Sequence, residues 1–301
     1  MAPGQVTWKQ MRDRYRVDAI HAGTRIYGVI ADPVAHSLSP VVHNAACAEA
    51  GIDCVYIPFR VPAQNLDEFL STAGRWPLAG LSVTIPHKES VMTHATPADD
   101  LVGPIGAANT LTFSAEGVRS FNTDAVAAVA SLESLIDEGE LAGRDAIRTA
   151  LVMGAGGAAR AVAFGLRSRG IDVTISGRTP ERARAIAAAV GCKTVDWPAR
   201  HRLPYDCIVN ATPIGMHPDV NESPFDAESL RTYMVVFDTV YNPENTLLVK
   251  QAREAGCRVV TGVEMFVRQA SAQFRIWHGS DPSQGVMRDA LKRATAAYKP
   301  D

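Results

Sequence analysis

Short runs of apolar and β-branched residues alternate along this chain with segments whose apolar residues recur at helical spacing. In the first half, runs at residues 25–30, 55–59 and 81–85 predict strands. Residues 109–121 predict a β-hairpin that turns at Glu116-Gly117. An alternation of strands and helices is typical of an α/β fold.

Helix boundary signals lie between these strands. Ser39 as N-cap and Pro40 as the first helical residue predict a helix that ends at Gly51. A segment rich in polar residues, 62–72, predicts a second helix, and Asp124 opens a third.

The second half repeats a strand–helix–strand order more regularly. A helix ending near Arg169 follows its first strand, residues 180–190 form a helix between Thr179 and Gly191, and residues 245–255 contain another. The predicted strands are residues 150–153, 171–176, 207–210, 235–238 and 258–260. We expect two domains with their boundary near Asp124.

Composition and charge narrow the class of protein. The 301 residues are 47% hydrophobic and 21% charged, which suits one large or two ordinary globular domains. A net charge of −2 and a pI near 6.5 show no excess of positive charge that would bind nucleic acid. A small-molecule substrate is therefore expected. No apolar stretch reaches the roughly 18 residues of a membrane span, and no membrane partner is expected.

The cysteines indicate the compartment. There are five of them, Cys47, Cys54, Cys192, Cys207 and Cys257, with no CxxC pair. An odd number without paired spacing favours reduced thiols over disulfides or a zinc site. We therefore predict a cytoplasmic protein and no metal.

A glycine-rich loop lies in the middle of the chain. Gly154, Gly156 and Ala159 match the GxGxxG/A pattern between a predicted strand and a predicted helix. Glycines there permit a tight turn and a close approach to a pyrophosphate, whose charge meets the positive end of the helix. The alternative is a glycine turn needed only for helix packing.

The end of the next strand indicates which dinucleotide binds. An NAD enzyme usually carries an acid about 20 residues after the loop, but this chain has Ser176-Gly177-Arg178-Thr179 followed by Arg182. Two guanidinium groups beside a helix N-terminus suit a phosphate dianion, which favours NADP(H). The alternative is a solvated helix start.

Polar clusters follow the predicted strands of the first half. His36-Ser37-Leu38-Ser39-Pro40 places two hydroxyls near a helix N-terminus, where they suit a substrate carboxylate or simple capping. Thr84-Ile85-Pro86-His87-Lys88 offers a lysine that is either an acid/base group or a solvated charge. Asn109 begins the hairpin and Asn122-Thr123-Asp124 ends it; Asp124 alone suits a helix cap.

Together these clusters resemble the shikimate dehydrogenase family over roughly residues 25–279. Besides HSLSP, TIPHK and the glycine loop GAGGAAR, the chain has Ala108-Asn109-Thr110, Asn122-Thr123-Asp124, the run NATPIGM at 210–216, and a late segment from Gly262-Val263-Glu264-Met265 to Trp277-His278-Gly279. These motifs occur in the family's order.

The resemblance implies a two-domain α/β fold. It predicts a mixed α/β substrate domain at residues 23–123 and 263–301, and a Rossmann-type, doubly wound parallel sheet at residues 124–262 that binds NADP. The C-terminal helices are expected to return to the first domain. The oligomeric state is expected to be a monomer or a homodimer.

Residue roles follow from the same resemblance. It implies a catalytic pair, Lys88 and Asp124. Substrate contacts are expected at Ser37, Ser39, Thr84, Asn109, Thr123, Tyr241, Gln269 and Gln273. The cofactor is expected at Gly154, Ala155, Gly156, Gly157, Ala158, Arg178, Thr179, Arg182, Ala211, Thr212, Met216, Gly262 and Met265.

The implied reaction is the reversible reduction of 3-dehydroshikimate to shikimate by NADPH. Alternatives are a quinate/shikimate dehydrogenase using NAD, a methylenetetrahydrofolate-type dehydrogenase, and a non-catalytic NADP-binding regulatory module. Ser37 and Thr84 favour shikimate over quinate. Gly177, where the family commonly has asparagine, and Ala127, where it has glycine, depart from the pattern.

Residues 1–22 lie outside the dehydrogenase resemblance. Ala2-Pro3-Gly4-Gln5 and the segment Met11-Arg12-Asp13-Arg14-Tyr15 resemble the end of a type I dehydroquinate dehydratase. The chain is therefore a candidate for the dehydrogenase half of a bifunctional enzyme; the alternative is an unrelated N-terminal helix.

Overall fold

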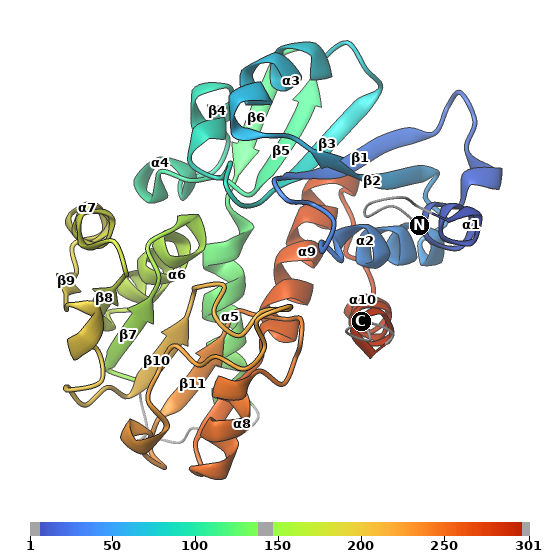
Figure 1. Ribbon diagram of the computed structural model, residues 1–301. Helices are drawn as coiled ribbons and strands as arrows, with labels where there is room; N and C mark the ends of the chain where they lie inside the picture. The colour runs from blue at the N-terminus through green and yellow to red at the C-terminus, as the bar shows by residue number, and fades with distance from the viewer. Residues whose placement is uncertain (1–6, 138–146, 297–301) are drawn as a thin grey trace. The chain divides into compact units, whose positions relative to one another are not determined.

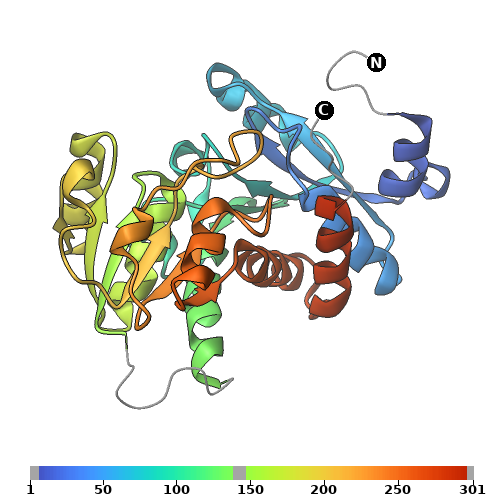
Figure 2. The same cartoon turned by 60° about the horizontal axis from the view of Figure 1, so that its bottom comes forward.

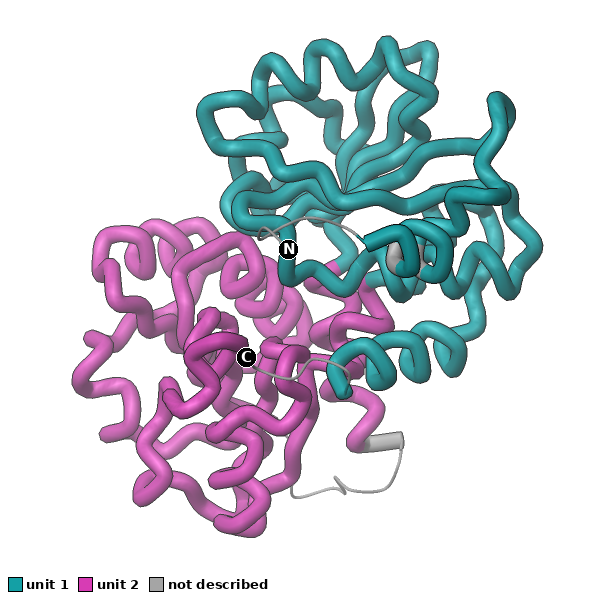
Figure 3. Tube along the Cα trace, turned by 45° about the vertical axis from the view of Figure 1, so that its right-hand side comes forward, with its two compact units in different colours: residues 1–123, 270–298 teal, residues 124–269, 299–301 magenta. Residues whose placement is uncertain are grey.

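The computed structural model describes residues 7–137 and 147–296, which form two compact units. Within these ranges, unit 1 contains residues 7–123 and 270–296, and unit 2 contains residues 124–137 and 147–269 (Figure 3). Each unit is built on its own six-stranded sheet. No helix among the described residues is both long and apolar enough to cross a bilayer.

The sheet of unit 1 is mixed (Figure 1). Its strand order is β2 (Cys54–Arg60), β1 (Arg25–Ala31), β3 (Leu78–Val83), β5 (Thr110–Ser114), β6 (Gly117–Phe121) and β4 (Thr96–Pro97). β1 runs parallel to β2 and β3, whereas β5 is antiparallel to β3 and β6. The ends of β1, β3 and β6 and the start of β5 therefore lie at one edge.

The helices of unit 1 come from both ends of the chain. They are α1 (Trp8–Tyr15), α2 (Ser39–Glu49), α3 (Leu66–Ala73), α4 (Val102–Ile105), α10 (Gln284–Ala296), the second half of α9 (Gly262–His278), and the 3₁₀ turns Val17–Ala19, Ala63–Asn65 and Ser90–Thr93. α10 packs against α2 (Figure 2). Trp277 of α9 lies over Gly80, where a Cβ would be 2.3 Å from the indole nitrogen, and that nitrogen donates to Leu111 O at 3.1 Å. Glycine at 80 is what admits the indole.

The sheet of unit 2 is entirely parallel. Its order is β12 (Arg258–Val260), β11 (Val235–Asp238), β10 (Cys207–Asn210), β7 (Thr149–Met153), β8 (Asp172–Ser176) and β9 (Lys193–Thr194). The accompanying helices are α5 (Thr123–Asp137), α6 (Gly157–Ser168), α7 (Pro180–Val190), α8 (Leu247–Glu254) and the first half of α9, with 3₁₀ turns at Trp197–Ala199 and Ala227–Ser229. The strand order reverses between β7 and β10, which is where doubly wound sheets bind nucleotides.

Two apolar clusters cover the two faces of this parallel sheet. One includes Val152, Val173 and Phe237, and the other includes Leu151, Met153 and Ile208. Neighbouring strand residues contribute to opposite clusters because side chains alternate across a strand. The continuous apolar runs that predicted these strands follow from burial on both faces.

Most predicted elements are confirmed to within a few residues, but four local expectations were wrong. Leu38, not Ser39, is the N-cap of α2, and the Ser39 N–H faces the Ser37 hydroxyl at 3.4 Å. Thr123, not Asp124, is the first residue of α5.

The other two errors are shifts along the sheet of unit 1. The third strand spans Leu78–Val83 rather than 81–85, because it is positioned by pairing with β1. The hairpin turns at Ala115-Glu116, since Ser114 pairs directly with Gly117. The two-residue strands β4 and β9 were not predicted because two residues carry no periodicity.

The N-terminal tail is helical where it is described. α1 packs against α2 and β2 within unit 1. The motif Ala2-Pro3-Gly4-Gln5 lies outside the described residues.

Candidate active site

One edge of the unit 1 sheet gathers most of the predicted substrate residues. Ser37 and Ser39 follow β1, Thr84 and Lys88 follow β3, Asn109 precedes β5, and Thr123 follows β6. The parallel and antiparallel pairings bring these positions to the same edge, although up to 86 residues of chain separate them.

Asn109 is fixed by hydrogen bonds on both sides of its amide. Its Nδ2 donates to Thr123 Oγ1 at 2.8 Å, and its Oδ1 accepts from the Thr123 N–H at 2.9 Å and the Thr110 hydroxyl at 2.8 Å. Both Asn109 and Thr123 are buried. The start of α5 is thereby tied to the sheet edge, and the two side chains are held in one arrangement.

The loop that carries Lys88 is held by its backbone. The Lys88 carbonyl accepts from the Ala108 N–H at 2.8 Å, and the Thr84 N–H donates to Ile30 O at 3.2 Å. His87 is buried with Nε2 2.7 Å from Val61 O, and burial lowers its pKa. His87 therefore stabilises the loop from the interior of unit 1, whereas the neighbouring Lys88 is partly exposed.

Gln273 lies in the interior of unit 1, with 1% of its surface exposed. Its Nε2 donates to Asn109 O at 3.0 Å and to Thr110 Oγ1 at 3.1 Å, and its Oε1 accepts from Ser82 Oγ at 2.6 Å. Tyr56 OH donates to Ser82 Oγ at 2.6 Å. Tyr56 and Ser82 were not predicted from the sequence, because each lies inside a strand and no motif marks either residue.

The glycine loop of unit 2 joins β7 to α6. Gly154 has φ +130°, and a Cβ there would lie 2.5 Å from Ala211 O. Gly156 is the N-cap of α6 with no side-chain cap, and a Cβ there would meet open space. Gly157 and Ala158 open the helix. The first N–H groups of α6 therefore have an accessible approach for a pyrophosphate, a cradle suited to a dinucleotide.

Positively charged residues lie at the start of α7, the helix that follows β8. Arg178, Thr179 and Arg182 are exposed at the N-terminus of α7, where Thr179 is the N-cap without a side-chain cap bond. A Cβ at Gly177 would lie 3.0 Å from the Cβ of Ala155. The strand end is therefore close to the glycine loop, as one binding surface for an adenosine phosphate requires.

A buried network supports the loop after β10. Asn210 Nδ2 donates to Asp238 Oδ1 and to Ile214 O, both at 3.0 Å, and Thr212 Oγ1 donates to Asn210 Oδ1 at 2.6 Å. Asp238 also accepts from Thr246 Oγ1 at 2.6 Å. Burial raises the pKa of Asp238 to about 6 despite these donors.

The remaining predicted residues of unit 2 lie on loops and helix starts. Gly262 begins α9, and a Cβ there would be 2.2 Å from Val240 O, so only glycine fits. Met265 is buried whereas Met216 is 39% exposed. The Tyr241 ring packs on Phe266 with centroids 4.3 Å apart. Gln269, partly buried, donates to Phe266 O at 3.0 Å.

The predicted catalytic pair belongs to different units. Lys88 is in unit 1, and Asp124 is the first residue of unit 2 and the second of α5. Asp124 is buried and directly follows Thr123, whose hydroxyl Asn109 holds. The pairing itself stays a prediction.

Comparison with known proteins identifies three matching segments. Residues 29–111 match the shikimate dehydrogenase substrate binding domain, and residues 262–292 match the shikimate 5'-dehydrogenase C-terminal domain. Residues 148–240 match a family described as NADP oxidoreductase, coenzyme F420-dependent. These segments contain the sheet edge, the late motif and the glycine loop, respectively.

Whole-chain relatives agree with this pattern. A shikimate dehydrogenase (NADP(+)) of Methanothermobacter thermautotrophicus is 38% identical over 90% of this chain and 96% of the relative. A chloroplastic bifunctional 3-dehydroquinate dehydratase/shikimate dehydrogenase of Arabidopsis thaliana is 39% identical over 92% of this chain but only 48% of its own length. The crystal structure of a Thermus thermophilus shikimate 5-dehydrogenase with NADP(H) and shikimate is 34% identical, covers 90% of this chain and all of its own, and has a TM-score of 0.80.

Proposed function

This chain belongs to the shikimate dehydrogenase family, and we propose that it catalyses the reversible reduction of 3-dehydroshikimate to shikimate with NADPH. The observation that carries this proposal is the convergence of Ser37, Thr84, Lys88 and the Asn109–Thr123 pair at one sheet edge. The Thermus relative binds shikimate and NADP(H).

Recognition of the substrate falls mainly to unit 1, with Gln269 and Tyr241 contributed by unit 2. The hydroxyls of Ser37 and Ser39, near the N-terminus of α2, suit the carboxylate, because helix N-termini favour anions. Thr84, Asn109, Thr123 and Gln269 suit the substrate hydroxyls. The buried amide of Gln273 supports a role in positioning Asn109, rather than the direct contact expected from the family.

Lys88 transfers the proton, and Asp124 positions Lys88. NADPH, when bound, supplies the hydride that reduces the ketone. The Lys88 ammonium stabilises the negative charge that develops on the ketone oxygen and donates a proton to it, while the Asp124 carboxylate orients the ammonium. In the reverse direction Lys88 takes the proton from the shikimate hydroxyl.

Cofactor binding falls to unit 2, the predicted NADP domain. The N-terminus of α6, with Gly154 to Ala158, holds the pyrophosphate, and Arg178, Thr179 and Arg182 at the start of α7 hold the adenosine phosphate. Ala211, Thr212, Met216, Gly262 and Met265 line the nicotinamide, with Tyr241 towards the substrate. Because residue 177 is glycine, it offers no side chain to the adenosine ribose, so the choice of NADP over NAD falls to Arg178 and Arg182.

The cellular compartment and the binding partners follow from the same proposal. Free thiols at all five cysteines support a reducing compartment, the cytoplasm. We propose a monomer or homodimer with a small-molecule substrate and no nucleic-acid partner. The bifunctional plant relative is matched over 48% of its length and motivates the proposal of a fused dehydratase domain; the length of the native gene product tests this.

The decisive experiment compares four substrate and cofactor pairs. Purified full-length protein is assayed with 3-dehydroshikimate or 3-dehydroquinate, each with NADPH or NADH, by following nicotinamide absorbance. We expect the highest kcat/KM for 3-dehydroshikimate with NADPH. A preference for 3-dehydroquinate or NADH would assign the quinate alternative, and tight NADPH binding without turnover would assign the regulatory one.

An arginine variant tests the cofactor assignment within the same assay. Arg178→Ala should lower kcat/KM for NADPH by roughly 10- to 100-fold and leave NADH nearly unchanged, since the lost contact is to a phosphate. Arg184→Ala, an exposed arginine of α7 paired with Glu181, is the matched control. Equal losses with both cofactors would refute this role of Arg178.

A further inference from the structure

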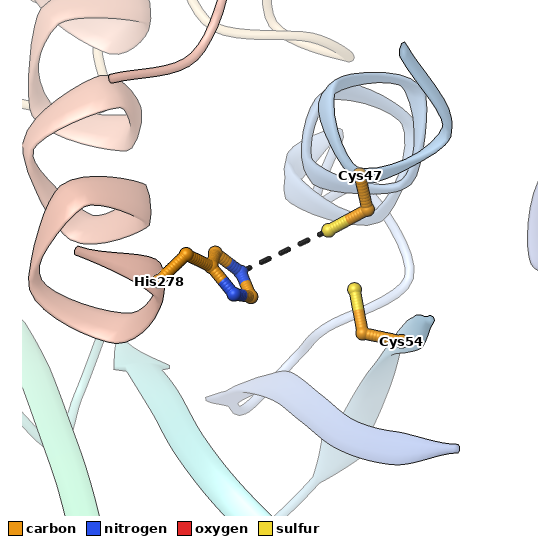
Figure 4. A group of neighbouring side chains, drawn as sticks. All are labelled: Cys47, Cys54 and His278. Carbon is orange, nitrogen blue, oxygen red and sulfur yellow. Dashed lines mark hydrogen bonds between the residues drawn. The ribbon is translucent and has the colours of Figure 1, made fainter. Parts of the chain in front are cut away.

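Two cysteines and a histidine from distant parts of the sequence meet inside unit 1 (Figure 4). Cys47 is on α2, Cys54 is the first residue of β2, and His278 is the last residue of α9. The two thiols and a ring nitrogen of His278 all lie within 4.8 Å of one another, and Cys47 Sγ is 3.9 Å from His278 Nε2. None of these residues has a role in the proposed reaction.

The separations are close to those of a tetrahedral zinc site. Zinc–sulfur bonds of about 2.3 Å and zinc–nitrogen bonds of about 2.0–2.1 Å place two sulfurs about 3.8 Å apart, and sulfur and nitrogen about 3.6 Å apart. The observed 3.9 Å between Cys47 Sγ and His278 Nε2 exceeds this spacing by only a few tenths of an ångström. The other two separations are at most 4.8 Å, so closing the site shortens each of them by no more than about 1 Å.

The imidazole is held in position and is ready to act as a ligand. The His278 ring packs against Tyr27, with centroids 4.9 Å apart, and against Phe274, with centroids 4.3 Å apart. These contacts hold the ring with Nε2 directed at Cys47 Sγ (Figure 4).

The donor set suits zinc. Cys47 and Cys54 are buried, with free thiols. Thiolate sulfurs, which form when a metal displaces the thiol protons, together with an imidazole nitrogen make a donor set that selects zinc over magnesium or calcium.

A cavity of about 290 Å³ extends to Cys54. Its lining includes Arg16, Thr24 and Asp53, and the Asp53 carboxylate accepts from the Thr24 hydroxyl at 2.9 Å. This polar cavity can supply a water molecule as the fourth ligand, because three protein ligands leave one tetrahedral position open.

We propose that Cys47, Cys54 and His278 bind one zinc ion that clips the end of α9 to α2 and β2. Binding exchanges two thiol protons for the metal: Zn²⁺ and two thiols give a neutral bis-thiolate complex and two released protons. The bound ion stabilises unit 1 by joining residues that are more than 200 positions apart in sequence.

Cobalt titration tests the site by spectroscopy. Reduced, metal-free, full-length protein is titrated with Co²⁺, and the cobalt is then displaced with Zn²⁺. We expect one equivalent per chain, an intense thiolate-to-cobalt charge-transfer band, and release of two protons. Cys47→Ser and Cys54→Ser should abolish the band, and His278→Gln should weaken binding at least tenfold.

Matched controls separate this site from nonspecific thiol binding. Cys192→Ser removes a partly exposed cysteine of unit 2 and should retain the full band. Zn²⁺ should raise the Tm of the wild type and of Cys192→Ser, but not that of Cys54→Ser. Dehydrogenase activity in the absence of metal should persist in all variants that fold, which circular dichroism verifies.

Three outcomes would overturn the proposal. These are the absence of a thiolate-to-cobalt band in the wild type, a band that survives in both Cys47→Ser and Cys54→Ser, or loss of the band in Cys192→Ser. Formation of a Cys47–Cys54 disulfide under air in excess Zn²⁺ would instead assign the pair to redox chemistry.

Discussion

Single residues at the sheet edge of unit 1 are held in place by hydrogen bonds within that unit. Asn109 is fixed by Thr123 and Thr110, and the backbone beside it is held by Gln273. The backbone of Lys88 is anchored through its carbonyl, which accepts from the Ala108 N–H. Pre-organisation of this kind limits the entropy lost when substrate binds.

The first prediction concerns Lys88. Lys88→Ala should lower kcat by about 10²- to 10⁴-fold, the usual contribution of general acid–base catalysis, while the KM for 3-dehydroshikimate changes only a few-fold. Steady-state kinetics measure both constants. Lys193→Ala, which removes an exposed lysine paired with Asp172, is the control. A kcat within a few-fold of the wild type would rule out Lys88 as the proton donor.

The second prediction concerns the buried carboxyl group of Asp238. Its pKa is raised from 3.8 to about 6 by burial, so the folded state disfavours the ionised form. Stability is therefore lost as the pH rises from about 4 to about 6, by about 3 kcal/mol at 1.36 kcal/mol per unit of pKa, and stays low above pH 6.

Asp238→Asn isolates this contribution because the amide cannot ionise. The free energy of unfolding of wild type minus variant, from urea denaturation at pH 4.5 and pH 7.5, should be lower at pH 7.5. The difference reports this carboxyl group because the other titrating groups are common to both proteins. A difference that is independent of pH would contradict the burial argument.

At the scale of elements, the glycine loop shows two glycines of one motif that serve different purposes. Gly154 is required by the fold: its φ is +130°, and a Cβ would clash with Ala211 O. Gly156 has space around it and an extended backbone conformation that other residues adopt. Its small size matters for the ligand, whose pyrophosphate approaches the N-terminus of α6.

The third prediction separates these roles. Gly154→Ala should destabilise the protein by about 1–3 kcal/mol or more, as expected for a non-glycine residue in strained backbone. Gly156→Ala should leave the Tm within about 2 °C and raise the Kd for NADPH at least tenfold. Thermal unfolding and fluorescence titration measure the two effects. Equal destabilisation by both substitutions would show that the loop serves packing alone.

Sequence periodicity predicted these elements well where burial is regular. The central strands of unit 2 are buried on both faces, so their apolar runs predicted Cys207–Asn210 and Val235–Asp238 with their observed bounds; the partly buried Arg258–Val260 was also predicted with its observed bounds. In unit 1 the ends of β3 and of the hairpin depend on pairing with neighbouring strands, and there the prediction was shifted. Local pattern does not report cross-strand register.

At the scale of the whole molecule, the chain forms two compact units. α9 runs through the boundary, with its start in unit 2 and its end in unit 1. Gln269 closes unit 2, and Gln273, one turn later, anchors Asn109 in unit 1. A single helix thereby belongs to both units.

The fourth prediction assigns one ligand to each unit. NADP⁺ alone should slow amide hydrogen exchange at residues 154–160 and 177–183 of unit 2, whereas shikimate alone should slow it at residues 84–88 and 109–123 of unit 1. Peptide-level mass spectrometry measures this, with quinate as the control ligand. Protection of residues 154–160 or 177–183 by shikimate alone would contradict the division.

The amino-acid sequence by itself determined the α/β class, most of the elements, the glycine loop and the family motifs, because each of these is written in residues close together in the chain. Only the tertiary structure decided the interior position of Gln273, the burial of Asp238 and the meeting of Cys47 and Cys54 with His278. The spacing of the cysteines predicted no metal site, since ligands supplied by two helices and a strand have no sequence spacing to detect. Such contacts depend on how strands pair and helices pack, which are properties of the folded chain.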